Sequence, residues 1–226
     1  MTKQPSSERR SFLTRLHVGA ASLAVLLGRS ASAQQVRSAT AARFEPARHD
    51  KDDWMDELPG KHRLVFDTIS PAGLSDAYLF ASNFMLVNRN DYGLQNSDVA
   101  VIIVVRHLST AFGFNDEMWK KYSEPMAKGA GDFVDPKTKS APTTNVYAAG
   151  MGGQVAKQGL QLAVCSMATR RVAGSIAQAV NGKADDINAE LIANLVPNAR
   201  MVPAGIVAMS RAQERGYTLA VSDRMI

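Results

Sequence analysis

Cysteine is almost absent from this chain of 226 residues, which contains only Cys165. A single cysteine cannot close a disulfide within the chain, and it cannot form a Cys-x-x-Cys redox motif or a zinc site built from several thiolates. After residue 33, no segment stays apolar for the roughly 18 residues that a membrane-spanning helix needs. Charged residues make up 21% and apolar residues 46% of the chain, as in ordinary soluble proteins. We therefore expect a folded domain without stable membrane insertion.

Charge is distributed unevenly along the chain. The formal net charge is +5, but residues 1–33 alone carry five basic side chains and one acidic side chain. The remainder is nearly neutral, with 21 basic and 20 acidic residues. Nucleic-acid binding needs a basic surface that persists in the folded domain. We therefore expect no nucleic acid among the partners.

Residues 1–33 resemble an export signal. The sequence SERRSFL at residues 7–13 is similar to the twin-arginine motif, with Glu8 where serine is usual. An apolar stretch follows at residues 18–27, and Ala31-Ser32-Ala33 offers the small residues that a signal peptidase reads. The alternative is an amphipathic N-terminal helix with an incidental arginine pair. We expect cleavage after Ala33 and a periplasmic protein.

Downstream of the leader, the sequence alternates between strand-like and helix-like segments. Residues 34–58 are polar and are interpreted as a flexible lead-in, so the domain should span residues 59–226. Short apolar runs predict strands near residues 62–69, 98–106, 160–165, 200–202 and 217–221. Helical spacing predicts helices near residues 73–93, 112–122, the end of 145–159, 169–180, 185–195 and 205–215. This order predicts an α/β fold of three layers, with a five-stranded, mainly parallel sheet and helices on both faces.

Residues 116–150 form an insertion between the predicted second and third strands. Within it, residues 129–144 are rich in glycine, proline, lysine, serine and threonine, which predicts a long exposed loop. The glycines at positions 150, 152 and 153 lack the Lys-Ser/Thr pair of a phosphate-binding loop, so a hinge is the favoured interpretation.

The carboxyl ends of the strands are the expected place for a site, because ligands in such sheets bind beyond those ends. Cys165 closes the predicted third strand and immediately precedes a helix. His107 closes the second strand. If these strands are neighbours, the two residues share one edge of the sheet.

The C-terminal half resembles the DsrE/DsrF-like family. The resemblance rests on Cys165 at a strand end, Val172 and Ile176 in the next helix, Pro197, and the segments VPAGIV (202–207) and QERGY (213–217). It spans roughly residues 60–223. It implies a five-stranded α/β fold, a homo-oligomer of three or more copies, and sulfur relay on a cysteine that carries persulfide sulfur. The chain departs from the family in Ser166-Met167, where glycine often follows the cysteine, and in the insertion.

Cys165 has two interpretations. A thiolate is the nucleophile in sulfur transfer, and a helix N-terminus or nearby cations stabilise it. The resemblance implies that Cys165 is a sulfur carrier or nucleophile. The alternative is an inert residue at a buried strand end, since free cysteines are among the most buried residue types.

The neighbours of Cys165 carry similar pairs of interpretations. His107 could support the cysteine or ligate a metal, although a surface histidine in a turn is the favoured interpretation. Met151 and Met167 could complete a copper site with Cys165 and His107. Methionine more commonly fills gaps in a protein core. Arg170 and Arg171, with Ser166 and Thr169, could bind an anionic ligand at the helix start. A solvated helix face is the favoured interpretation of the two arginines.

The function expected from the sequence is sulfur handling by an exported, DsrE-like carrier rather than by a turnover enzyme. Its partners would be further copies of the chain and a protein that donates or accepts sulfur, and no cofactor or resident metal is implied. Two alternatives remain open: an oligomeric binding module that uses the loop at residues 129–144, and a periplasmic metal-binding protein.

Overall fold

The computed structural model describes residues 45–148 and 151–222, apart from the side chain of Met151. The predicted leader, residues 1–33, lies outside the described residues. The strands are β1 (His62–Thr68), β2 (Val99–Val105), β3 (Gln161–Cys165), β4 (Ala199–Val202) and β5 (Thr218–Val221). The α-helices are α2 (Trp54–Glu57), α3 (Pro71–Tyr92), α4 (Asp116–Gly129), α5 (Met151–Lys157), α6 (Ser166–Val180), α7 (Ala184–Ala193) and α8 (Gly205–Glu214). Short 3-10 helices are η1 (Asp50–Asp52), η2 (Asn96–Asp98) and η3 (His107–Gly113).

The five strands form one sheet in the order β4-β3-β2-β1-β5, and every neighbouring pair is parallel. This arrangement confirms the predicted fold class. All seven residues of β2 are buried, as expected for a central strand covered on both faces.

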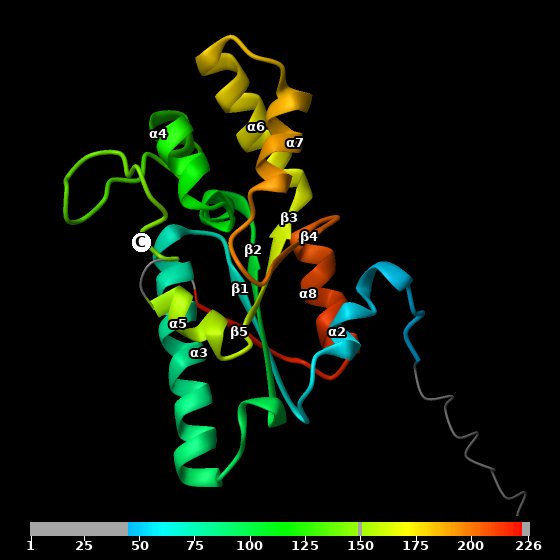
Figure 1. Ribbon diagram of the computed structural model, residues 1–226. Coiled ribbons are helices and arrows are strands. Elements are labelled where there is room, and N and C mark those ends of the chain that lie inside the picture. The colour runs from blue at the N-terminus through cyan, green and yellow to red at the C-terminus, as the bar shows by residue number, and fades with distance from the viewer. Residues whose placement is uncertain (1–44, 149–150, 223–226) are drawn as a thin grey trace, which may run out of the picture. The chain divides into compact units, whose positions relative to one another are not determined.

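The order of the strands determines which helices cover which face. From β1 to β4 the chain steps across the sheet in one direction, and right-handed connections then place the intervening helices on one face. The core on that face combines buried residues of α3, α4, α5, α6 and α7 (Figure 1). The last connection runs back from β4 to β5, beyond β1, and places α8 on the opposite face.

The second face is completed by residues 46–58, which we call the arm. Its α2 buries Trp54 and Met55 against the same face as α8. The Tyr217 hydroxyl donates to the Met55 carbonyl at 2.7 Å, and the Arg200 guanidinium lies 4.4 Å from the centre of the Trp54 ring. Residues 46–58, predicted as part of the flexible lead-in, therefore pack onto the domain. Their acidic side chains also pair with Arg211 and Arg215 of the second face.

Helix starts differ from prediction by a few residues for local reasons. Helix α3 begins at Pro71 rather than near residue 73, because the Ser70 side chain accepts a hydrogen bond from the Gly73 amide and Pro71 suits the first helical position. Helix α6 begins at Ser166 rather than Thr169, directly after β3. The predicted helix at residues 112–122 is instead η3 followed by α4, whose start is capped by the Asn115 side chain.

The insertion is fastened to the domain by an aromatic cluster and one buried amide. The ring of Phe112 lies 4.9 Å from Trp119, 5.0 Å from Phe133 and 4.6 Å from Tyr147. Below this cluster, the fully buried Asn145 donates to the carbonyls of residues 112 and 114 at 2.8 and 2.7 Å. Its side-chain oxygen accepts from the amides of residues 147 and 148. One side chain thus joins the end of the loop to η3.

No helix in residues 45–148 and 151–222 is long and apolar enough to cross a membrane.

We predict that Asn145→Ala destabilises the protein by about 2–3 kcal/mol, because buried backbone groups lose their partners. Chemical denaturation would measure the change in unfolding free energy. Asn96→Ala is the matched control, since Asn96 is exposed in η2. Equal stability of the two variants would show that Asn145 does not fasten the insertion.

Candidate functional site

The carboxyl ends of β1, β2 and β3 lie side by side and bring the residues predicted for a site to one edge. Thr68 pairs in register with Val105, and Val105 with Val164. Arg106 and Cys165, each one residue further on, are therefore neighbours on adjacent strands. His107 follows Arg106 as the first residue of η3. The expectation that His107 and Cys165 share one edge of the sheet agrees with this geometry.

An ion pair that sequence reasoning missed occupies the same edge. The Arg106 Nε and Nη2 atoms each donate to one carboxylate oxygen of Asp67, both at 2.7 Å. The Asp67 side chain is 9% exposed and that of Arg106 is 26% exposed. Such two-pronged contacts are among the stronger and more directional ion pairs. The available signal in the sequence was an aspartate directly after the apolar run Leu64 to Phe66.

Helix α8 packs tightly against this pair at its first residue. A Cβ atom at Gly205 would lie 2.8 Å from the Arg106 Cβ and 2.9 Å from the Arg106 Cδ. Only glycine fits without displacement of the arginine. Val202, the register partner of Cys165, lies three residues before Gly205. The N-termini of α6 and α8 therefore both lie beside the end of β3.

Hydroxyl groups fix the backbone of the edge. Thr68 Oγ1 donates to the Val104 carbonyl at 2.8 Å and lies 3.0 Å from Ser109 Oγ. Ser109 Oγ in turn accepts from the Arg106 amide at 3.0 Å and lies 2.8 Å from the Arg106 carbonyl. Thr68 and Ser109 are fully buried. This network makes the edge a rigid support for whatever binds there.

Cys165 is mostly buried, and 7% of its surface is exposed. It is the residue that precedes α6, and its side chain makes no capping hydrogen bond. The hydroxyl of fully buried Thr169 donates to the Cys165 carbonyl at 3.0 Å. The predicted binding role of Thr169 does not fit this geometry, because its hydroxyl is used inside the helix.

The other predicted site residues differ in their surroundings. His107 is exposed and has a positive φ of 56°, an uncommon conformation for a residue other than glycine. Arg171 Nη2 donates to the His107 carbonyl at 2.9 Å and so supports this backbone. Within the described residues no hydrogen bond joins the His107 ring to Cys165. Ser166 is half-buried, and Arg170 is exposed.

The insertion forms a groove against α6, with a volume of about 750 Å³. Arg171 and Lys128 contribute positive charge to its walls, Glu124 and Asp132 contribute negative charge, and Val172 lies among its apolar residues. The groove therefore offers a mixed polar and apolar surface near the exposed end of η3.

No cluster of three or more histidine, cysteine, aspartate or glutamate side chains suited to a metal ion occurs in the part of the chain that the structure describes. Met167, considered as a copper ligand, exposes 68% of its surface on α6. The side chain of Met151 lies outside the described residues.

Comparison with known proteins finds a likeness only among solved structures. No family model and no curated protein matches the chain. A solved structure of a protein of unknown function, MTH1491 from Methanobacterium thermoautotrophicum, aligns with 71% of this chain and 99% of its own length, at 16% identity and a TM-score of 0.37.

We predict that Asp67→Asn lowers the unfolding free energy by about 2 kcal/mol, because two charge-assisted hydrogen bonds to Arg106 are weakened in a mostly buried setting. Urea denaturation is the measurement. Asp91→Asn, at an exposed position on α3, provides the control. If both variants unfold at the same urea concentration as the parent, the ion pair does not stabilise the edge.

Proposed function

We propose that this chain is an exported sulfur-handling protein that carries sulfane sulfur as a persulfide on Cys165. The observation that carries the proposal is the position of Cys165 at the carboxyl end of β3, with the N-termini of α6 and α8 beside it. Helix N-termini stabilise anions such as a thiolate or a persulfide. The resemblance of residues 60–223 to the DsrE/DsrF-like family supports the same role.

The chemistry requires no external oxidant. The Cys165 thiolate attacks the sulfane sulfur of a polysulfide or of a persulfide on a donor protein. A new S–S bond forms at Cys165, while the S–S bond within the donor breaks. The donor fragment leaves as a thiolate or hydrosulfide and takes up the proton that Cys165 released. Transfer to an acceptor thiolate is the same exchange in reverse.

Low exposure of Cys165 suits a carrier. A persulfide that is open to solvent exchanges with any available thiol, whereas one at a site with 7% exposure is partly shielded. Arg106 and Asp67 neutralise one another beside Cys165, so the helix N-termini are the electrostatic support that acts on the sulfur. No acid or base hydrogen-bonds to the thiol in the described residues, which favours a carrier over a turnover enzyme.

Export is part of the proposal because residues 1–33 resemble a twin-arginine signal. That route moves folded proteins, so a completed domain would reach the periplasm. A lone cysteine has no partner in its own chain there, and it remains available for sulfur exchange.

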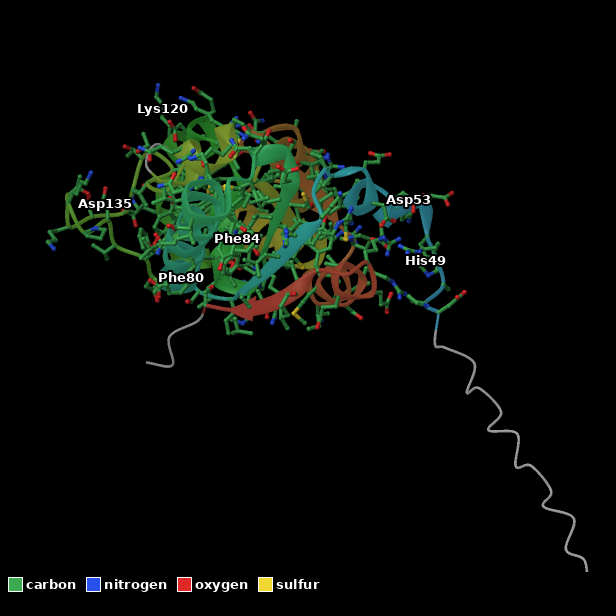
Figure 2. The ribbon with its side chains drawn as sticks, turned by 90° about the horizontal axis from the view of Figure 1, so that it is seen from below. His49, Asp53, Phe80, Phe84, Lys120 and Asp135 are labelled. Carbon is green, nitrogen blue, oxygen red and sulfur yellow. The ribbon has the colours of Figure 1, made fainter. Side chains whose placement is uncertain are left out.

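Self-association is proposed from the surface of α3. Leu79, Phe80, Leu86 and Val87 each expose between 41% and 46% of their surface. Phe80, Phe84 and Val87 line an apolar groove of about 470 Å³ between α3, β1 and β5. Figure 2 labels Phe80 and Phe84 on this helix. Residues 77–88 of α3 contain no charged side chain, although part of this helix faces outward. Apolar patches of this kind mark interaction sites, and a second copy of the chain is the proposed occupant.

A second candidate function is favoured by the groove that contains Arg171. An oligomeric binding module would hold its ligand between α4 and α6, with no covalent step at Cys165. Such a module would retain its ligand in Cys165→Ala, whereas a sulfur carrier would lose its function.

We predict that the purified protein, incubated with polysulfide, gains the mass of one or more sulfur atoms. Intact-mass spectrometry would detect the adduct, and treatment with a reductant should remove it. Cys165→Ser, the closest change in size, should gain nothing. Absence of an adduct on the native protein would contradict the carrier role.

We predict that Phe80→Glu shifts the protein to a smaller species, because a charge in the apolar groove opposes burial by a second copy. Sedimentation velocity would measure the species present. Val180→Glu provides a matched control, since Val180 is exposed on α6, away from the α3 groove. A native protein that sediments as a monomer would exclude self-association through this face.

A further inference from the structure

A second cavity lies at the amino end of β3, the end opposite Cys165. Its volume is about 640 Å³, within the range of small-molecule sites. Leu160, Leu162, Val196 and Pro197 supply an apolar lining. Because Cys165 and the carboxyl edge contribute nothing to this lining, the proposed sulfur chemistry leaves the cavity unexplained.

Tyr78, on α3, is one of the polar residues in the lining, which also contains Lys157, Gln161 and Asn198. The residue is 4% exposed, and its hydroxyl has no hydrogen-bond partner among the described residues. Tyr78 lines this cavity and also a smaller one of about 250 Å³. A hydroxyl that borders a cavity and has no protein acceptor can donate its hydrogen bond to a ligand bound there.

Glycines keep the wall beside Tyr78 open. A Cβ atom at Gly152 would lie 2.9 Å from Tyr78 Cζ, at the hydroxyl-bearing end of the ring, and 2.7 Å from the Tyr147 carbonyl oxygen. A Cβ atom at Gly153 would lie 2.4 Å from the Ala148 carbonyl oxygen. Gly152 therefore lets α5 approach Tyr78 closely, and Gly153 lets the start of α5 pack against the Ala148 carbonyl.

The polar groups around the cavity indicate the chemistry of a ligand. Burial raises the pKa of Tyr78 well above its ordinary value, so its hydroxyl stays protonated and can donate. Burial likewise raises the pKa of neighbouring Tyr147 to about 12. Lys157 is the one charged residue in the described lining, and it is exposed, so its ammonium group is available at the cavity.

From this lining, we infer that the cavity binds a small molecule with an apolar, aromatic or branched aliphatic body and one anionic group. The body contacts the leucine, valine and proline side chains. Tyr78 donates a hydrogen bond to the ligand, and Lys157 attracts its anionic group. The site is separate from Cys165 and does not depend on the proposed sulfur chemistry.

The test uses two fluorescent probes in parallel, 1-anilinonaphthalene-8-sulfonate and its uncharged analogue N-phenyl-1-naphthylamine. The native protein should bind both in a saturable manner, and the sulfonate more tightly. Tyr78→Phe should weaken sulfonate binding about three- to tenfold, the effect of one lost hydrogen bond. Its thermal stability should not fall, because the hydroxyl has no partner to lose. Lys157→Gln should weaken binding of the sulfonate but not of the uncharged probe.

A pair of leucine variants on α5 separates this cavity from other apolar surfaces that bind such dyes. Ala156→Leu places a larger side chain in the lining and should abolish binding of both probes. Gln154→Leu, at an exposed position of the same helix outside the lining, should leave binding unchanged. If Ala156→Leu does not fold, the Tyr78→Phe and Lys157→Gln variants provide the test instead. No binding by the native protein, or equal binding by folded Ala156→Leu, would overturn the inference.

Discussion

The need to cover both faces of a parallel sheet governs this fold. Three connections step in one direction and supply one face with α3 to α7, while the single return connection supplies the other face with α8 alone. Five strands are too wide a surface for one helix of ten residues. The arm therefore completes the second face, with Trp54 and Met55 buried in the same core as α8. A stretch of chain outside the alternating pattern thus becomes part of the domain.

The same topology brings the residues of the candidate site to one edge of the sheet. Parallel strands end together, so Asp67, Arg106 and Cys165 meet although they are distant in sequence. The ion pair and the Thr68–Ser109 hydroxyl network hold two of these strand ends, and Gly205 allows α8 to start against them. Cys165 lies at the same edge, and a fixed surround of this kind suits the persulfide carrier that we propose. The insertion forms its groove with Leu108 of η3 and with α6.

Strand positions could be predicted from the sequence because buried β-branched runs such as residues 99–105 have few alternatives. The helix at α3 was predicted from its spacing, but its start depends on the Ser70 cap, which a scan for apolar periodicity does not weigh. The arm was missed because its acidic residues look solvated until Arg215, 159 residues beyond Asp56, is placed beside them. The Asp67–Arg106 pair was missed for the same reason, since 39 residues separate its members. Long-range pairing between charges leaves little periodic trace in a single sequence.

The arm gives the two faces of the sheet different sensitivities to salt. The face under α3 to α7 is held mainly by apolar packing, which does not depend on screening. The arm combines its apolar anchors with charged contacts, among them Arg215 Nε to Asp56 Oδ2 at 3.0 Å and Arg48 Nη1 to the same carboxylate oxygen at 3.0 Å. The Asp56 carboxylate is 43% exposed, so dissolved ions reach it. Rising ionic strength therefore loosens one side of the sheet before the other, and the arm, at residues 46–58, is the part that responds first.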